Sequence, residues 1–409
     1  MEASSRPPLH LAVALDGAGW HPAAWRDEGA RPAALLTPGY WTDLVEESER
    51  GLIDFVTFDD QMGLQSSRRG VSDERVDRVR GRLDAVLTAA RVAPATRHIG
   101  LVPVATTTHT EPFHVSQAIA SLDYVSERRA GVQVRVSATG LEARLFGRRD
   151  IADRRPAVGD GQSGPSAGDV GDLFDEAADF VEVVRRLWDS WEDDAEIRDA
   201  ATGRFIDRDK LHYIGFECRF FDVRGPSITP RPPQGQPVVS VLAHVPAAFR
   251  LAARCADVVF VTPHTPDQLV AILAEVRQAE KAESRVGAPL KVFVDVLVHL
   301  EDKPGAAADR RDRLDRLDGR VDRSDAPIVT ATPEALADLL VAWHIPGVAG
   351  FRLRPAVLPR DLEAVTDGVV PILQQRGVFR TRYGEHSLRD RLGLARPANR
   401  YVTAGELVG

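Results

Sequence analysis

Polar and titratable side chains follow short apolar runs along the chain. Asp59 and Asp60 come directly after the apolar run that ends at Phe58, and His244 comes just after the run Val238–Leu242. Carboxylates and an imidazole can hold a polar ligand through hydrogen bonds, and a histidine of ordinary pKa can move a proton near neutral pH. These residue types therefore predict ligand binding and proton transfer, provided that one scaffold gathers the segments.

The same placement recurs after the other apolar runs. The full set of such residues is Asp16, His21, Trp25, Arg26, Asp59, Asp60, Thr106, Thr107, Thr108, His109, Gln133, Arg135, Ser137, His244, Thr262, His264, His299, Arg352 and Arg354. Each alone has an ordinary structural explanation, since Asp60 can cap a helix and threonine is common in strands. The prediction of a site depends on their convergence at one place in the fold.

The scaffold follows from the apolar pattern, which alternates between short runs and helical periodicity. The predicted strands are Leu9–Leu15, Ile53–Phe58, Ile99–Ala105, Gly131–Val136, Val238–Leu242, Val258–Val261, Lys291–Leu300 and Ala349–Leu353. The predicted helices are Asp43–Arg50, Leu83–Ala93, Pro112–Ser126, Asp172–Trp191, Pro246–Ala253, Pro266–Ala282, Pro333–Trp343 and Arg360–Arg376. Regular alternation predicts parallel strands joined by right-handed crossovers.

A closed barrel and an open doubly wound sheet are the two folds that fit this alternation. Eight units without a Gly-rich first turn favour closure, so we expect an α/β fold of the (β/α)8 TIM-barrel class. In such a barrel the functional groups come from the loops that follow the strands, which is where the polar residues above lie.

Three stretches interrupt the repeat, and a tail follows it. We expect residues 1–376 to form one barrel, with insertions near residues 148–171, 193–237 and 304–327, and residues 377–409 to form a C-terminal extension. Gly, Pro, Asp and Arg dominate the first insertion, which predicts a mobile loop. The second contains extended segments, His212–Gly215 and Arg219–Val223. The third is expected to hold a solvated helix and a disordered end, and the tail to pack outside the barrel or contact a partner.

Composition narrows the class of partner. The 409-residue chain has a net charge of -8 and a pI of about 5.8, which favours neither nucleic acid nor an anionic membrane as a partner. Cys218 and Cys255 are isolated, so they predict neither a disulfide framework nor a zinc site. No apolar run approaches the roughly 20 residues that cross a bilayer. We expect a cytoplasmic protein with reduced thiols and no metal.

Several segments carry a resemblance to a known family. They are Ala24–Arg26 (AWR), Glu49–Asp60 (with DFVTFDD), Ile99–His114, Ala120–Ser137, Glu176–Ala195 (with LWDSWEDDA), Gly203–Ile214 and Arg391–Tyr401 (RLGLARPANRY). With these the chain resembles the bacterial luciferase-like flavin-dependent monooxygenases. The LWDSWEDDA block and the tail resemble the branch that contains nitrilotriacetate monooxygenase and the sulfone monooxygenases.

The resemblance implies a (β/α)8 barrel, usually dimeric, that uses reduced FMN and O2 to oxygenate a small organic substrate. It implies an NAD(P)H-dependent flavin reductase as partner, and a homodimer or a heterodimer with a second family member. Carried over by position, the flavin-binding residues are Asp60, Thr106, Thr107, Gln133, Ser137 and His244, and His21 is the candidate catalytic acid or base.

The chain departs from the family pattern where the FMN phosphate binds. Phe174 stands where the family offers a tyrosine, Ala243-His244-Val245 replaces a Gly-Ser-Ser turn, and Ala248 stands where glycine is common. Three lost donor positions predict weaker phosphate binding, at roughly 1–3 kcal/mol each. His244, Arg135 or Arg352 can supply substitute charge. Two alternatives follow: a non-catalytic paralogue or partner subunit, and an oxidoreductase that uses a deazaflavin for hydride transfer.

Overall fold

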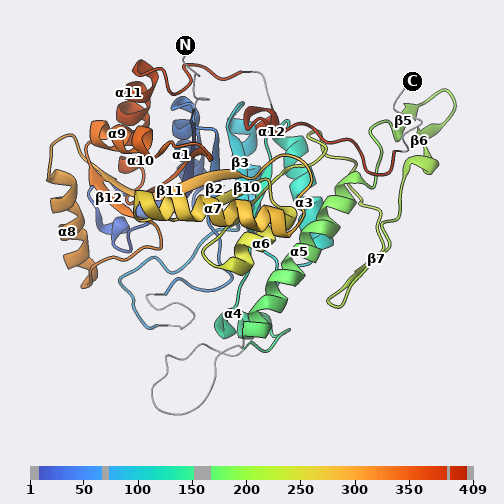
Figure 1. Ribbon diagram of the computed structural model, residues 1–409, viewed down its shortest axis with the longest axis horizontal. Helices are drawn as coiled ribbons and strands as arrows, with labels where there is room; N and C mark the ends of the chain where they lie inside the picture. The colour runs from blue at the N-terminus through green and yellow to red at the C-terminus, as the bar shows by residue number, and fades with distance from the viewer. Residues whose placement is uncertain (1–8, 67–72, 152–166, 385–386, 403–409) are drawn as a thin grey trace.

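Eight parallel strands form a closed ring in the computed structural model, which describes residues 9–66, 73–151, 167–384 and 387–402 (Figure 1). Around the ring they are β1 (His10–Leu15), β2 (Phe55–Phe58), β3 (Gly100–Thr106), β4 (Gly131–Arg135), β9 (Val238–Leu242), β10 (Val258–Val261), β11 (Lys291–Leu300) and β13 (Val348–Pro355). The ring closes because β10 pairs with β11 and β13 pairs with both β11 and β1. The predicted (β/α)8 barrel is confirmed.

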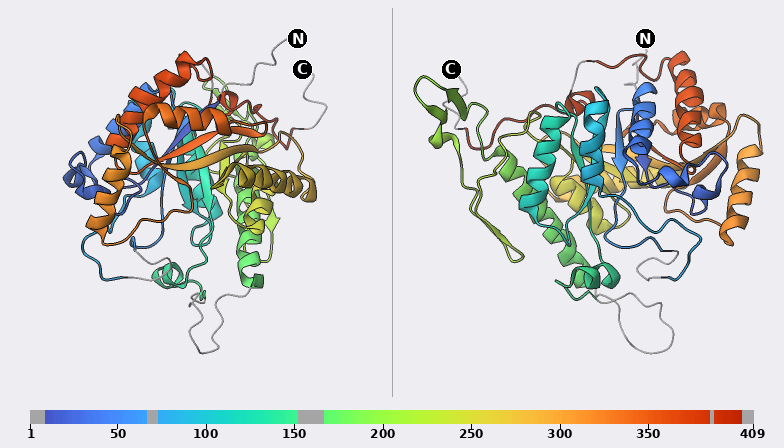
Figure 2. Two further views of the ribbon diagram at one scale, coloured as in Figure 1. Left: turned by 60° about the vertical axis from the view of Figure 1, so that its left-hand side comes forward. Right: turned by 180° about the vertical axis from the view of Figure 1, so that it is seen from behind.

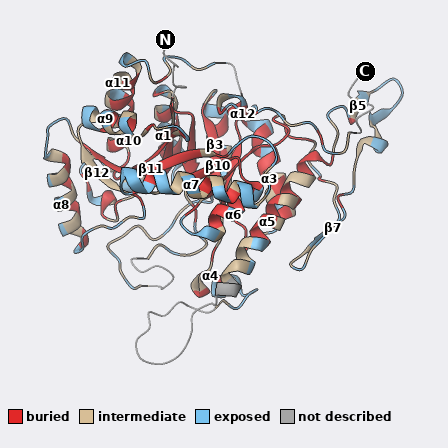
Figure 3. Ribbon diagram, in the orientation of Figure 1, coloured by how far each residue is buried: buried red, intermediate tan, exposed pale blue. Residues whose placement is uncertain are grey.

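Helices surround the strands and bury the outer face of the ring (Figure 3). They are α1 (Pro38–Arg50), α2 (Ala85–Val92), α3 (Pro112–Val125), α5 (Ala167–Asp189), α6 (Pro246–Cys255), α7 (Pro266–Ala282), α9 (Pro333–Trp343), α10 (Arg360–Ala364) and α11 (Val370–Gln375), the last two joined by a π-helical turn, Val365–Val369. Because the strands are covered on both faces, their sequences are apolar almost throughout.

Inside the ring the side chains form an apolar lower layer, near the starts of the strands, and a polar upper layer, near their ends. The lower end of the barrel is the one drawn towards the top of Figure 1. Phe55 of β2 and Phe293 of β11 meet in the lower layer, with ring centroids 5.4 Å apart. Two residues further along their strands stand Thr57 and Asp295, both buried. Since side chains alternate along a strand, every second residue points inward, and the interior turns polar towards the ends of the strands.

The C-terminal tail closes the lower end of the barrel. Leu388 in α12 (Leu388–Arg391) and Leu392 pack into the same cluster as Phe55 and Phe293. Arg391 donates to the carbonyl oxygens of Asp54 at 2.8 Å and His98 at 2.5 Å, which lie just before β2 and β3. The tail thus packs on the barrel, which was one of the two arrangements expected from the sequence. Figure 1 shows α12 at the edge opposite to α4 (Gly140–Phe146), which follows β4.

Several boundaries differ from the predicted ones. Helix α1 begins at Pro38 instead of Asp43, because the Thr37 side chain accepts the backbone N–H of Tyr40 and caps the helix there. Strand β13 continues to Pro355, two residues beyond the predicted end. Helix α4 and strand β12 (Ile328–Ala331), which pairs with the outer half of β11, were not predicted.

The second insertion projects from the barrel as two small hairpins (Figures 1 and 2). They pair β5 (Glu196–Asp199) with β6 (Arg204–Ile206), and β7 (Phe216–Glu217) with β8 (Asp222–Val223). The predicted extended segment Arg219–Val223 includes β8, and β7 begins at Phe216, directly after the predicted segment His212–Gly215.

The third insertion holds the predicted solvated helix, α8 (Ala306–Asp318). Its end was predicted to be disordered, and this is wrong: Asp325 is tied by an ion pair to Arg354 of β13. Most of the predicted mobile loop, residues 152–166 of the first insertion, lies outside the described residues.

Candidate functional site

The mouth of the barrel, the end at which all eight strands finish, gathers the predicted polar residues. Asp60 follows β2, Thr106 ends β3, Gln133 lies in β4 and His244 follows β9, and these four strands are consecutive in the ring. The pairing places Thr106 beside Arg135 and Gln133 beside Ser240. Because the strands are parallel, their carboxyl ends meet at one rim, so these groups lie on one face of the molecule.

A buried ionic cluster crosses the barrel axis just below the mouth. Asp295 of β11 accepts hydrogen bonds from Nε of Arg352 at 2.8 Å and from Nε of Arg354 at 3.0 Å, both on β13. Arg352 also donates to Oε1 of Gln133 at 2.5 Å, and its guanidinium carbon lies 3.6 Å from the centre of the Phe260 ring. One buried carboxylate therefore serves two buried guanidinium groups.

The amide nitrogen of Gln133 is left over from this cluster. Gln133 is 6% exposed, and its Nε2 donates to no atom of the described residues, although its Oε1 is used by Arg352. A polar ring bound over the mouth can therefore accept a hydrogen bond from this N–H.

Closer to the mouth, Arg354 binds a second carboxylate, that of Asp325, which lies on a loop. Asp325 accepts from Nη1 of Arg354 at 2.6 Å and from Nη2 at 3.1 Å. Nε2 of His244 lies 3.2 Å from Oδ2 of that carboxylate, the oxygen that also accepts from Nη2, and Trp20 covers the guanidinium with its ring centre 4.6 Å away. Burial alone would raise the pKa of Asp325, but the hydrogen bond with His244 and the Arg354 charge outweigh burial and hold that pKa well below its usual range.

The corner between β3 and β4 brings three of the predicted residues together. Arg135 donates to Oγ1 of Thr106 at 3.0 Å and pairs with Glu142 of α4 at 2.8 Å. Thr107 donates its hydroxyl to the carbonyl of Arg135 at 3.3 Å, and the Ser137 hydroxyl lies 3.4 Å from that of Thr139. Thr106, Thr107 and Ser137 thus hold α4 and the strand ends in place.

His109, in the same corner, is buried with an unused nitrogen. Its ring stacks on Phe146 of α4, with centroids 5.0 Å apart, and no atom of the described residues bonds to Nε2. Burial lowers the pKa of His109, which favours the neutral imidazole.

Carboxylates that follow β1 and β2 form the neighbouring part of the mouth, because β2 pairs with β3. Arg82 bridges Asp59 at 2.8 Å and Asp16 at 3.4 Å. Asp60 accepts the backbone N–H of Ala85, the first residue of α2, at 3.3 Å, while the N-cap of that helix is Asp84. Burial raises the pKa of Asp16 to about 6; Arg82 opposes this rise and the negative charges of Asp59 and Asp60 add to it. Asp16 therefore titrates near neutrality.

His21 lies apart from these groups. Its Nδ1 accepts the N–H of Ala23 at 3.1 Å and its Nε2 lies 3.1 Å from Asp315 of α8, so both ring nitrogens are engaged in joining the loop after β1 to α8. His299, whose ring centroid is 5.8 Å away, is fully buried, and burial lowers its pKa to about 2, with the positive charge of Arg310 adding to the effect. The structure does not bring His21 together with Gln133 and His244.

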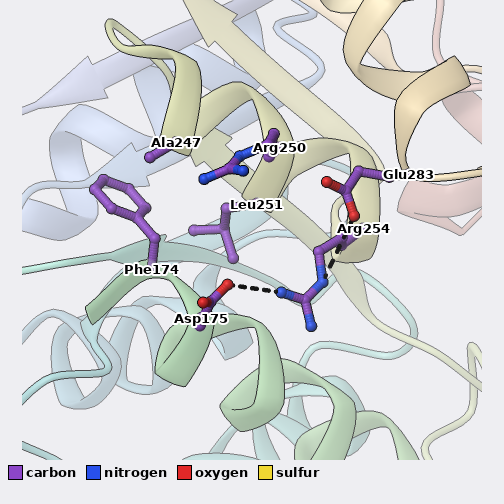
Figure 4. A pocket seen from close by; sticks show the side chains of 7 residues that line it. All are labelled: Phe174, Asp175, Ala247, Arg250, Leu251, Arg254 and Glu283. Atoms are coloured by element: carbon purple, nitrogen blue, oxygen red, sulfur yellow. Dashed lines mark hydrogen bonds and ion pairs between the residues drawn. The ribbon is translucent and has the colours of Figure 1, made fainter. Parts of the chain in front are cut away.

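A pocket beside the mouth lies between α5 and α6 (Figure 4). Phe174 and Asp175 line it from α5, and Ala247, Arg250, Leu251 and Arg254 line it from α6, with Glu283 at one end. Arg254 is held by Asp175 at 3.1 Å. Arg250 makes no hydrogen bond or ion pair with any described residue, and it lies four positions after Pro246, the first residue of α6. The sequence interpretation missed this free cation, although it follows Ala248 by only two residues.

The sequence as a whole matches a known protein family. The model of the family described as luciferase-like monooxygenase matches residues 20–348, which is most of the chain. The chain belongs to the luciferase-like monooxygenase family. The resemblance found in the sequence is thereby confirmed.

Relatives support the branch as well as the family. The chain is 30% identical to nitrilotriacetate monooxygenase component A of Aminobacter aminovorans over 96% of this chain and 97% of that protein. It is 29% identical to N-acetyl-S-(2-succino)cysteine monooxygenase of Bacillus subtilis over 98% and 99% of the two chains. The EDTA monooxygenase structure from Chelativorans sp. BNC1 has the same fold, with a TM-score of 0.79 at 24% identity over 95% of this chain and 99% of that one.

Luciferase-like monooxygenases of this kind use O2 and reduced FMN that a separate reductase supplies. Among the described residues, no helix has the length and apolar character needed to cross a bilayer, and no group of side chains has the composition to hold a metal ion.

Proposed function

We propose that this luciferase-like monooxygenase binds reduced FMN across the mouth of the barrel and uses O2 to oxygenate a small organic substrate there. The observation that carries the proposal is the buried Gln133–Arg352–Asp295 cluster at the axis, which leaves the Gln133 amide nitrogen free. A flavin ring carries carbonyl and nitrogen acceptors along one edge, and an amide N–H that no described residue uses can donate to one of them.

The residues present fit the two ends of FMN. At the ring end, Gln133 offers a free N–H, and Asp60, Thr106, Thr107, Ser137 and His244 border the mouth. At the phosphate end, the first turn of α6 offers the backbone N–H of Ala247, since Pro246 has none and those of Ala248 and Phe249 bond to the Val245 carbonyl. Arg250 offers a guanidinium without a carboxylate partner among the described residues. A helix N-terminus with an arginine beside it favours a dianion. Arg250 thus compensates for the hydroxyls missing at Phe174 and in the Ala243–Val245 turn.

Bound FMN supplies the reduction of O2 and the transfer of one oxygen atom. The chain itself positions the reactants and excludes water, with Trp20 and Phe260 covering the two guanidinium groups near the axis. Asp16 is better suited than His21 to hold a proton at the mouth, because its pKa lies near 6 whereas both nitrogens of His21 are engaged elsewhere. An acid in this range exchanges protons readily near neutral pH.

The relative from Aminobacter is named as one component of a monooxygenase. By analogy, we propose that an NAD(P)H-dependent flavin reductase supplies the reduced FMN to this chain in the cytoplasm. We propose further that the chain works as a homodimer or as a heterodimer with a second family member.

Flavin fluorescence quenching with the purified chain tests the proposal at both ends of the cofactor. Arg250→Ala should weaken FMN about tenfold or more, the equivalent of a lost charged hydrogen bond, and leave riboflavin unchanged because riboflavin has no phosphate. Gln133→Leu should weaken FMN and riboflavin alike. Arg208→Ala, an exposed arginine on the projecting insertion, is the matched control and should change neither.

Absence of FMN binding below about 100 μM would contradict the proposal. Tighter binding of a deazaflavin than of FMN would favour hydride transfer, and FMN binding without oxygenation when a reductase is supplied would favour a non-catalytic partner subunit.

A further inference from the structure

We propose that Arg354 and His244 form a binding site for a carboxylate group of the substrate, and that Asp325 occupies this site until the substrate arrives. The inference rests on the proposed function, because it names the substrate class of the same mouth: small organic acids. The ligand carboxylate exchanges with the side chain of Asp325, and no covalent bond changes.

The charge balance at the axis leaves one positive charge for an anion to neutralise. Arg352 and Arg354 are both buried, and they share the buried carboxylate of Asp295. Two guanidinium groups and one carboxylate sum to one excess positive charge, and a buried charge without a partner is strongly unfavourable. Asp325 supplies the missing negative charge from a loop.

Asp325 differs from Asp295 in how firmly the fold holds it. The side chain of Asp295 is 0% exposed, whereas that of Asp325 is 43% exposed. Apart from Arg354 and His244, its carboxylate accepts only from the neighbouring Ser324, at 3.3 Å, and the contact with Nε2 of His264 at 3.1 Å involves its backbone oxygen and not its side chain. The side chain can leave the arginine and return to water without uncovering the core.

The donors that Asp325 uses suit a ligand carboxylate equally well. Nη1 and Nη2 of Arg354 form a planar fork that can donate two hydrogen bonds to any carboxylate in the same geometry. Nε2 of His244 adds a third donor from the side, and the imidazole is 34% exposed, so it borders the solvent. Thr262 fixes the other nitrogen of His244 at 3.1 Å.

Arg354 carries this role, and Arg352 does not. Every donating nitrogen of the Arg352 fork is already used, by Asp295, Gln133 and Thr57, and Phe260 covers its face. Arg354 instead directs Nη1 to the loop carboxylate alone and shares Nη2 between that carboxylate and Asp295. An uncharged substrate would leave those nitrogens tied to Asp325 and would gain nothing from them.

Isothermal titration of the full-length chain, without flavin, with succinate and with its uncharged diamide tests the exchange. Succinate should bind and the diamide should not. Asp325→Asn should bind succinate about tenfold tighter than the natural chain, because the internal competitor loses its charge. Asp322→Asn, which removes a carboxylate from the same loop three residues earlier, is the matched control and should bind succinate as the natural chain does.

Three results would overturn the inference. The first is equal affinity for succinate and the diamide. The second is no succinate binding by either the natural chain or Asp325→Asn. The third is loss of succinate binding when FMN is saturating, since Arg354 would then belong to the flavin. Failure of FMN to bind, with succinate binding intact, would instead count against the proposed function. Circular dichroism of Asp325→Asn should match that of the natural chain, which makes a change in affinity interpretable.

Discussion

Asp295 is a single carboxylate in the middle of an apolar strand. The free-energy cost of burying its charge depends on its partners. Its two oxygens accept from both Arg352 and Arg354. The pattern of the run Lys291–Leu300 predicts a strand correctly, but nothing in that run shows that this carboxylate meets two arginines from β13. The sequence marks the two arginines only as polar residues at a strand end, because their shared partner lies on β11 and meets them only in the closed ring.

The first prediction concerns this residue. Asp295→Asn should lower the free energy of unfolding by about 3–5 kcal/mol, because it leaves two buried guanidinium groups without their shared counter-charge. Urea unfolding followed by circular dichroism measures the loss. Asp302→Asn, an exposed aspartate just beyond β11, should change stability by less than about 0.5 kcal/mol. Equal effects of the two substitutions would show that the buried cluster does not stabilise the barrel.

At the scale of elements, the sequence predicts best where an apolar run is flanked by turn residues. The bounds of β9, β10 and β11, and of α7 and α9, agree with the prediction. Short elements with few apolar residues, such as α4 and β12, were missed because neither offers a full period of the pattern. The path of residues 319–327 could not be predicted either, since Asp325 is held by contacts with β13 and with the loops after β9 and β10.

The tail is the element whose contribution is easiest to measure. Leu388 is 0% exposed and packs at the lower end of the barrel, so Leu388→Ala should cost about 2–5 kcal/mol of unfolding free energy. Leu87, which is 71% exposed on α2, provides a control whose change to alanine should cost less than about 0.5 kcal/mol. A Leu388→Ala protein as stable as the control would mean that the tail rests on the barrel without sealing it.

At the scale of the whole molecule, the buried Asp54 near the lower end of the barrel links segments that are far apart in the sequence. Asp54 binds His10 at 2.9 Å, the backbone N–H of Leu11 at 2.8 Å, and Arg380 of the tail, so it connects β1, the start of β2 and the extension. Burial alone would raise the pKa of Asp54, but the positive charges of His10 and Arg380 and their hydrogen bonds outweigh burial and lower that pKa to about 2.

A carboxyl whose pKa is lower in the folded state stabilises the fold above the unfolded pKa and loses that effect as the pH falls through the folded pKa. Asp54 should therefore contribute roughly 2 kcal/mol at pH 6, and this contribution should vanish between about pH 4 and pH 2. Urea midpoints of the natural chain and of Asp54→Asn should differ at pH 6 and converge near pH 2. A constant difference across this range would show that Asp54 does not titrate with unfolding.

The sealed lower end has a consequence for the order of events. Leu388, Leu392 and the phenylalanines beneath the ionic cluster fill the lower end of the axis, so we expect cofactor and substrate to enter at the mouth. A flavin in the deepest position must enter before the substrate and leave after the product, which predicts an ordered sequence of binding and release.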